Sequence, residues 1–129
     1  MLTTEQIEDN LELMANTIEA FNSLDVNKTI DYLSEIVSLQ ATATETQASA
    51  KYHLLKAINE ELDRQAKLMK KDDISPSIKK MRADSMCAEW HYIYEKCQRY
   101  SSNISHTIDA VRTKISYLKQ ELENSRFNK

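Results

Sequence analysis

Hydrophobic residues recur at intervals of three and four along most of this 129-residue chain, the spacing that places them on one face of an α-helix. The first such run predicts a helix over residues 4–23. Its apolar face consists of Ile7, Leu11, Met14, Ile18 and Phe21. Thr3 or Thr4 can cap this helix, and Thr3 with Gln6 has the spacing of a capping box.

A second helix is predicted over residues 26–71. Aliphatic residues near its two ends define its stripe: Val26, Ile30, Leu33 and Val37, then Leu55, Ile58, Leu62 and Met69. Residues 40–50, between these ends, are small and polar and allow either a continuous helix or a local break. We expect a continuous helix, because alanine is the best helix former and neither glycine nor proline interrupts the stretch.

A turn is predicted at residues 72–76, followed by a helix over residues 76–125. Ser75 is a suitable N-cap, and Pro76 would occupy the first helical position, where proline is well tolerated. Within this helix, the spacing between successive seam residues alternates between three and four for five heptads. The seam residues are Cys87, Trp90, Tyr94, Cys97, Ser101, Ile104, Ile108, Val111, Ile115, Leu118 and Leu122. Such regularity is typical of a coiled-coil seam.

Composition supports an all-α fold, because the chain has no glycine and one proline and is therefore poor in tight turns. A short turn between two long helices predicts an elongated antiparallel helical hairpin, with His53 near Tyr94. We expect the N-terminal helix to pack beside residues 26–45 and 104–122. Residues 1–129 would then form a single domain, a three-helix bundle at one end and a bare two-helix hairpin at the other.

The bare end of the hairpin predicts self-association. Apolar residues there would be exposed unless a partner covered them, and a second copy of the chain is the simplest partner. We therefore expect a homodimer or a higher even oligomer that forms through residues 46–103. The residues expected at this surface are Leu55, Ile58, Leu62, Cys87, Trp90, Tyr94 and Cys97.

Charge is distributed unevenly along the chain. Residues 1–45 carry nine acids and one base, whereas residues 46–103 carry eleven bases and eight acids. Cations around the predicted turn could contact nucleic-acid phosphates: Lys67, Lys70, Lys71, Lys79, Lys80 and Arg82. Acids on the first helix could instead mimic nucleic acid: Glu5, Glu8, Asp9, Glu12 and Glu19. Each cluster is also compatible with an ordinary solvated helix surface.

Several kinds of chemistry are disfavoured. The chain lacks glycine-rich phosphate loops, and a rod offers no concave site for acid–base chemistry, so we expect neither enzymatic activity nor a cofactor. Cys87 and His91 have the spacing of two metal ligands, but no further ligands accompany them, so we expect a core thiol, a surface histidine and no metal. Neither a run of about 18 apolar residues nor a signal-peptide pattern occurs, which predicts no membrane association and a cytoplasmic location.

The C-terminal helix contains an Asp-x-x-Arg pair, Asp109 and Arg112, and then an Ile-Ser-x-Leu-Lys-x-Glu run from Ile115 to Glu121. Over about 40 residues this part of the chain resembles the last helix of small helical-hairpin proteins that bacteriophages and prophages encode. Those proteins lie among genes for DNA recombination, annealing or single-strand binding. The resemblance implies an accessory, non-catalytic role in phage DNA metabolism.

These patterns together predict a non-enzymatic, self-associating helical interaction protein with a protein partner, and the resemblance implies a phage accessory factor in DNA recombination or replication. Two alternatives remain open. One is a nucleic-acid-binding module that uses the lysine-rich turn. The other is an inhibitor that occupies a site on a host protein through its acidic N-terminal part.

Overall fold

The structure is a computed structural model that describes residues 1–23, 26–68 and 75–127. All elements within these residues are helical, which confirms the predicted all-α class. Most of the predicted turn at residues 72–76 lies outside the described residues. None of the helices within them combines the length and the hydropathy needed to span a bilayer.

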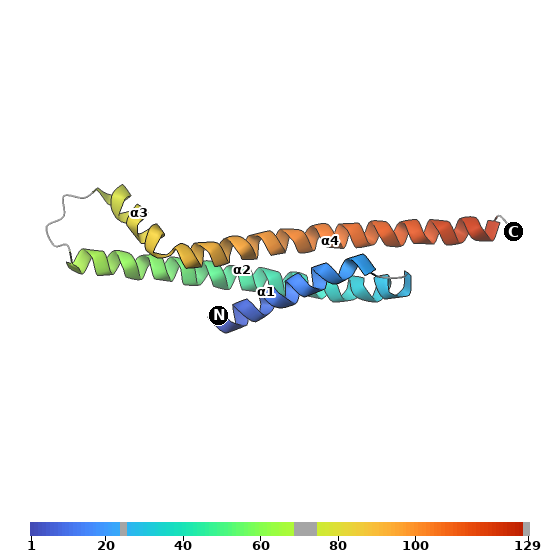
Figure 1. Cartoon of the computed structure of the whole chain (residues 1–129), viewed down its shortest axis with the longest axis horizontal. Helices are drawn as coiled ribbons and strands as arrows, with labels where there is room; N and C mark the ends of the chain where they lie inside the picture. The colour runs from blue at the N-terminus through green and yellow to red at the C-terminus, as the bar shows by residue number, and fades with distance from the viewer. Residues whose placement is uncertain (24–25, 69–74, 128–129) are drawn as a thin grey trace.

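Two long helices define the shape of the molecule. They are α2 (Val26–Leu68) and α4 (Ala88–Phe127), which lie side by side and run in opposite directions along a slender rod (Figure 1). The shorter α1 (Thr4–Glu19) and a following 3-10 turn, η1 (Ala20–Ser23), lie along this pair. At the other end, α3 (Pro76–Met86) is set at an angle to α4.

The helices begin where the capping residues predict. The Thr3 side chain accepts a hydrogen bond from the Gln6 amide at 3.2 Å, and the Gln6 side chain accepts one from the Thr3 amide at 2.9 Å. These two bonds confirm the capping box. Ser75 caps α3 by accepting from the Ile78 amide at 3.4 Å, and Pro76 follows at the first helical position.

Helix α2 is continuous through residues 40–50, but it turns a different face to the core from the one predicted. Its buried apolar residues are Tyr32, Ile36, Leu39, Ala43, Ala50 and Leu54. Three residues of the predicted stripe lie at the surface instead, since Ile30 is 49% exposed, Val37 37% and Leu55 50%, and Leu33, Ile58 and Leu62 are only partly buried. The prediction followed the largest aliphatic residues, whereas the middle of the buried face consists of small ones.

The N-terminal end of α1 lies further along α2 than predicted, while its C-terminal end lies beside Tyr32 within the predicted range. The prediction placed it beside residues 26–45, yet the amide of Leu2 donates to Ser49 at 3.2 Å and the Asn10 side chain donates to Thr46 at 3.1 Å. Small buried residues explain this position, because a helix surface without bulk lets a third helix approach closely enough to pack at the density of a protein interior. Thr46 and Ser49 are fully or almost fully buried under α1.

The predicted single helix over residues 76–125 is divided at Cys87 into α3 and α4. Cys87 has φ −102° and ψ 20°, and its amide still donates to the Ala83 and Asp84 carbonyl oxygens at 3.1 and 3.2 Å, so the chain bends without losing its hydrogen bonds. On the two sides of the bend, His91 donates to Asp84 at 3.3 Å. Asp, Ser and Cys are weak helix formers, which leaves residues 84–87 free to follow tertiary contacts.

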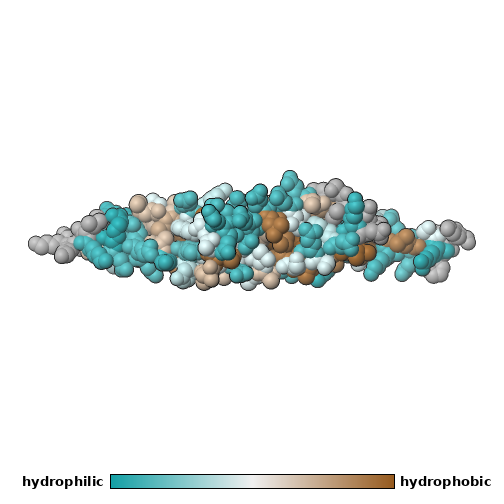
Figure 2. All heavy atoms as spheres, turned by 90° about the horizontal axis from the view of Figure 1, so that it is seen from below, coloured by the Kyte–Doolittle hydropathy of each residue, from teal (hydrophilic) through white to brown (hydrophobic). Residues whose placement is uncertain are grey.

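One apolar core runs through the overlap of α1, α2 and α4. The part of it that α4 supplies belongs to the predicted seam, in which four residues are at most 2% exposed: Cys97, Ile104, Ile108 and Val111. The seam leaves the core towards the C-terminus, where Leu122 is 58% exposed. On the face shown in Figure 2, hydrophilic residues predominate and hydrophobic ones reach the surface in small separate patches.

Candidate interaction surfaces

An aromatic stack marks the middle of the hairpin. The His53 ring on α2 stacks on the Trp90 ring on α4, with centroids 4.9 Å apart and planes 17° from parallel. Tyr52 meets the same imidazole edge-on at 5.6 Å. The Nε2–H of His53 donates to the Leu2 carbonyl oxygen at 2.7 Å, so one side chain links α2, α4 and the segment just before α1. The prediction paired His53 with Tyr94, one helical turn away, because it located the turn by residue counting alone.

Buried hydroxyl groups beneath α1 have their hydrogen bonds satisfied. The Thr46 hydroxyl accepts from Asn10 and donates to the Thr42 carbonyl oxygen at 2.6 Å. Near the other end of α1, Tyr32 donates to the Thr17 carbonyl oxygen, and burial followed by the nearby charge of Glu35 raises the pKa of the tyrosine. These bonds fix where α1 sits, because a buried polar group left unpaired costs free energy.

Both cysteines lie inside the hairpin, which corrects the prediction that they belong to a self-association surface. Cys87 is 7% exposed and Cys97 is 1% exposed, because both occupy seam positions that face α2. Burial raises the pKa of the Cys97 thiol to about 11. Burial, and then the charges of Glu61 and Asp84, also raises the pKa of Cys87. Neither environment favours a thiolate nucleophile.

The other five residues of the predicted self-association surface divide into two groups. Trp90 and Tyr94 are half-buried and pack against the core from the α4 side. Leu55 is half-exposed, and Ile58 and Leu62 are partly exposed on the same side of α2. Only this second group therefore offers an apolar edge to another molecule.

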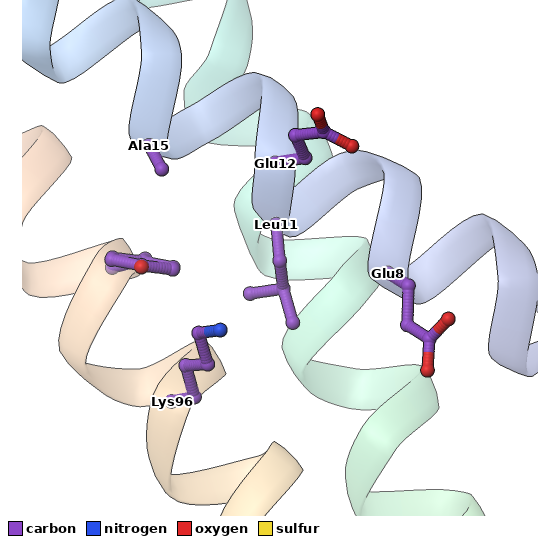
Figure 3. Close-up of a pocket in the computed structure, with 6 residues that line it drawn as sticks. Glu8, Leu11, Glu12, Ala15 and Lys96 are labelled. Carbon is purple, nitrogen blue, oxygen red and sulfur yellow. The ribbon is translucent and has the colours of Figure 1, made fainter.

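A shallow groove of about 290 Å³ lies between α1 and α4 (Figure 3). Leu11 and Ala15 form its apolar side, and Glu8 and Glu12 lie along α1 beside them. Lys96 reaches from α4 towards α1, with its amine 5.7 Å from the centroid of the Tyr100 ring. A groove this open, with one cation already engaged by an aromatic ring, has the chemistry of a solvated seam between helices.

The acidic residues singled out on the first helix are all exposed: Glu5, Glu8, Asp9, Glu12 and Glu19. The structure thus presents negative charge along α1, over the middle of the rod. An inhibitor that mimics nucleic acid would use this side, although exposed acids on a helix are equally expected for solubility.

At the tip, three residues of the predicted cation cluster are exposed: Lys67, Lys80 and Arg82. Lys79 is half-buried, and Lys70 and Lys71 lie outside the described residues. Three apolar side chains on α3 are also exposed, which the predicted sites did not include: Ile78 at 45%, Met81 at 69% and Met86 at 67%. One sequence feature could have indicated these exposed residues: the few apolar residues of segment 76–86 do not form one helical face.

A second hollow of about 260 Å³ lies between α2 and α3 at this end. Arg64 donates to both carboxylate oxygens of Glu61, at 2.6 and 2.9 Å, and this bonding lowers the pKa of Glu61. Gln65 is 6% exposed, donates to Glu61 at 3.3 Å, and its Oε1 finds no hydrogen-bond partner in the described part of the chain. Arg82 also lines the hollow, so its charged side chains carry one net positive charge, and this end is less completely bonded than the middle.

Metal ligands do not converge in residues 1–23, 26–68 and 75–127, where no group of three or more His, Cys, Asp and Glu side chains could hold an ion. His91 instead bonds to Asp84.

Comparisons with models of protein families, with curated proteins and with solved structures found no match for the chain. The described surface of this molecule offers three candidate regions for a partner: an apolar edge on α2, an acidic α1 and a basic tip.

Proposed function

We propose that the chain is a non-enzymatic helical interaction protein that works as an oligomer. One observation carries the proposal: Leu55, Ile58 and Leu62 form an apolar edge on α2 that α1 leaves uncovered. Apolar rows on a long helix usually pack against another helix, because burial removes roughly 25 cal/mol of free energy per Å² of apolar surface. A rod without a described cleft for chemistry fits a role in assembly better than a role in catalysis.

The resemblance of the C-terminal helix supports a more specific version of this proposal. The Asp109–Arg112 pair and the run from Ile115 to Glu121 suggest an accessory factor of phage DNA recombination or replication. On this reading the oligomer holds a recombination or replication protein through the surfaces that self-association leaves free.

Light scattering coupled to size exclusion tests the proposal. We expect the wild-type chain to have at least twice the 15.0 kDa mass of one copy, and Leu55→Asp to shift the population to the monomer. The matched control is Leu13→Asp on α1, because Leu13 is 48% exposed and Leu55 is 50% exposed. A wild-type monomer at every concentration, or equal effects of the two variants, would contradict the proposal.

A second function is favoured by the exposed cations of the tip. Lys67, Lys80 and Arg82 could contact phosphates of a single strand, in which case affinity would fall steeply with salt. Charge reversal of Lys80 and Arg82 should abolish such binding and leave the oligomer intact. Persistence of nucleic-acid binding in that variant would exclude the tip as its site.

A further inference from the structure

The apolar edge on α2 is one part of a longer row, which we call the outer stripe. Its members follow one another at steps of three and four: Ile30, Leu33, Val37, Gln40, Thr44, Gln47, Lys51, Leu55, Ile58 and Leu62. Helix α1 bonds to Thr46, and Leu2, just before α1, bonds to Ser49 and His53. Stripe residues lie two positions before each of these, and two positions turn a helix by about 200°, so the outer stripe faces away from α1.

The outer stripe is symmetric about its middle. Its two ends are aliphatic and its centre is polar, and each aliphatic residue has a counterpart on the other side of position 46 at a distance that agrees to within one residue. The pairs are Ile30 with Leu62, Leu33 with Ile58, and Val37 with Leu55. A second copy of α2, laid antiparallel with its own position 46 at the same level, would therefore meet aliphatic with aliphatic and polar with polar.

The centre of the stripe leaves room for a crossing helix. Two shallow hollows of about 290 and 260 Å³ lie there between α2 and α4, and Thr44 lines both of them. Their other walls are mostly small or polar: Gln40, Ala41, Ala43, Gln47, Ala48, Lys51, Tyr94, Ser101 and Ser105. In the antiparallel arrangement, Gln47 of the second copy lies opposite Thr44, where its amide side chain can enter a polar hollow.

Charge favours the same orientation. The part of the chain at residues 1–45 has nine acids against one base, and the part at residues 46–103 has eleven bases against eight acids. Antiparallel copies place the acidic part of each beside the basic part of the other, whereas parallel copies would place like charges together.

The contact area is sufficient for a specific dimer. From residue 30 to residue 62 the stripe is about 48 Å long, and a helix presents a strip about 10 Å wide. Two such strips bury roughly 1,000 Å², which is close to the smallest area found in specific protein interfaces.

We infer that the self-association proposed above is an antiparallel pairing of two copies through the outer stripe of α2, with the two-fold axis beside position 46. The inference rests on the proposed function, since it requires an oligomer, but it fixes the geometry of that oligomer. It moves the axis from the tip, where the sequence pattern centred it, to the middle of the rod. The aliphatic residues at the two ends of α2 then belong to one interface with a polar centre.

Cysteine cross-linking under mild oxidation tests this geometry in the full chain. Two copies of residue 47 lie about 3 Å apart along the helix axes, whereas two copies of residue 55 lie about 27 Å apart. We expect most Gln47→Cys molecules to form a disulfide-linked dimer and almost no Leu55→Cys molecules to do so. A mixture of Ile30→Cys and Leu62→Cys should cross-link more than either variant alone. Oxidised wild-type protein is the control, because its two thiols are buried.

Light scattering on the same reduced samples separates the possible failures. A dimer in which Leu55→Cys cross-links with itself, or in which Gln47→Cys does not, overturns the antiparallel arrangement and leaves the proposed oligomer in place. A wild-type chain that is monomeric throughout overturns both. Cross-linking of Gln47→Cys together with the mixed pair establishes the arrangement.

Discussion

Individual polar residues give this molecule its specificity. Thr46, Ser49 and His53 bond to α1 or to Leu2 just before it, and none of them is a residue that a search for large apolar side chains would select. Their effect is positional: they decide where α1 lies along a helix that is otherwise similar along its length.

Cys97 makes stability depend on pH. Its thiol keeps its proton until about pH 11 in the folded chain, whereas an ordinary cysteine has a pKa of 9.0. The folded state therefore binds more protons between these values, so stability is complete below about pH 9 and falls as pH rises towards 11. Urea unfolding should show a loss of about 1.4 kcal/mol from this thiol between pH 8 and pH 10.

The variant Cys97→Ala isolates this effect, because alanine cannot ionise. Between pH 8 and pH 10 it should lose less stability than the wild-type chain by about the same 1.4 kcal/mol. Identical pH dependence of the two proteins would show that the thiol ionises as easily inside the hairpin as in water.

The elements differ in how far local sequence determines them. The Thr3 capping box and the Ser75–Pro76 start were predictable, because each depends on residues within one turn. The bend at Cys87 was not, because it comes from contacts of α3 with the rest of the fold and no glycine or proline announces it.

The orientation of α2 differs more from the sequence prediction than the bend at Cys87 does. A hydrophobic stripe shows that a helix has an apolar face, but not which partner covers that face. The buried face of α2 is built around Ala43 and Ala50, which add little to any hydrophobic pattern, while the stronger aliphatic row at Ile30, Val37 and Leu55 points outwards. Leu55, Ile58 and Leu62, among the predicted association residues, lie on this outward side of α2.

The close approach of the helices at Ala50 can be tested by substitution. Ala50 is fully buried, so Ala50→Leu adds side-chain volume where the interior has no room and should destabilise the fold by about 1–3 kcal/mol. Ala66→Leu on the same helix is the matched control, because Ala66 is exposed and both residues are good helix formers. Denaturant unfolding that gave equal stabilities would argue against tight packing at this position.

Across the whole molecule, the local stability of each segment should increase with the number of helices packed beside it. Three helices overlap in the middle, where the buried residues of α1, α2 and α4 meet, while α3 and the last turns of α4 have fewer neighbours (Figure 1). Amide hydrogen exchange should therefore be slowest around residues 36–50 and 97–108 and fastest in residues 76–86 and 118–127. Uniform protection along α4 would mean that its C-terminal end is covered in solution, a result that an additional interface would explain.

Trp90 is the single tryptophan of the chain, and this gives the molecule a built-in optical reporter. Its ring stacks on His53, and the imidazole is held by the backbone of Leu2, just before α1. Release of the N-terminal segment would free the imidazole, alter the contact with the indole and change its emission. Fluorescence of the unlabelled protein can therefore follow whether the first helix is docked, in real time and without any substitution.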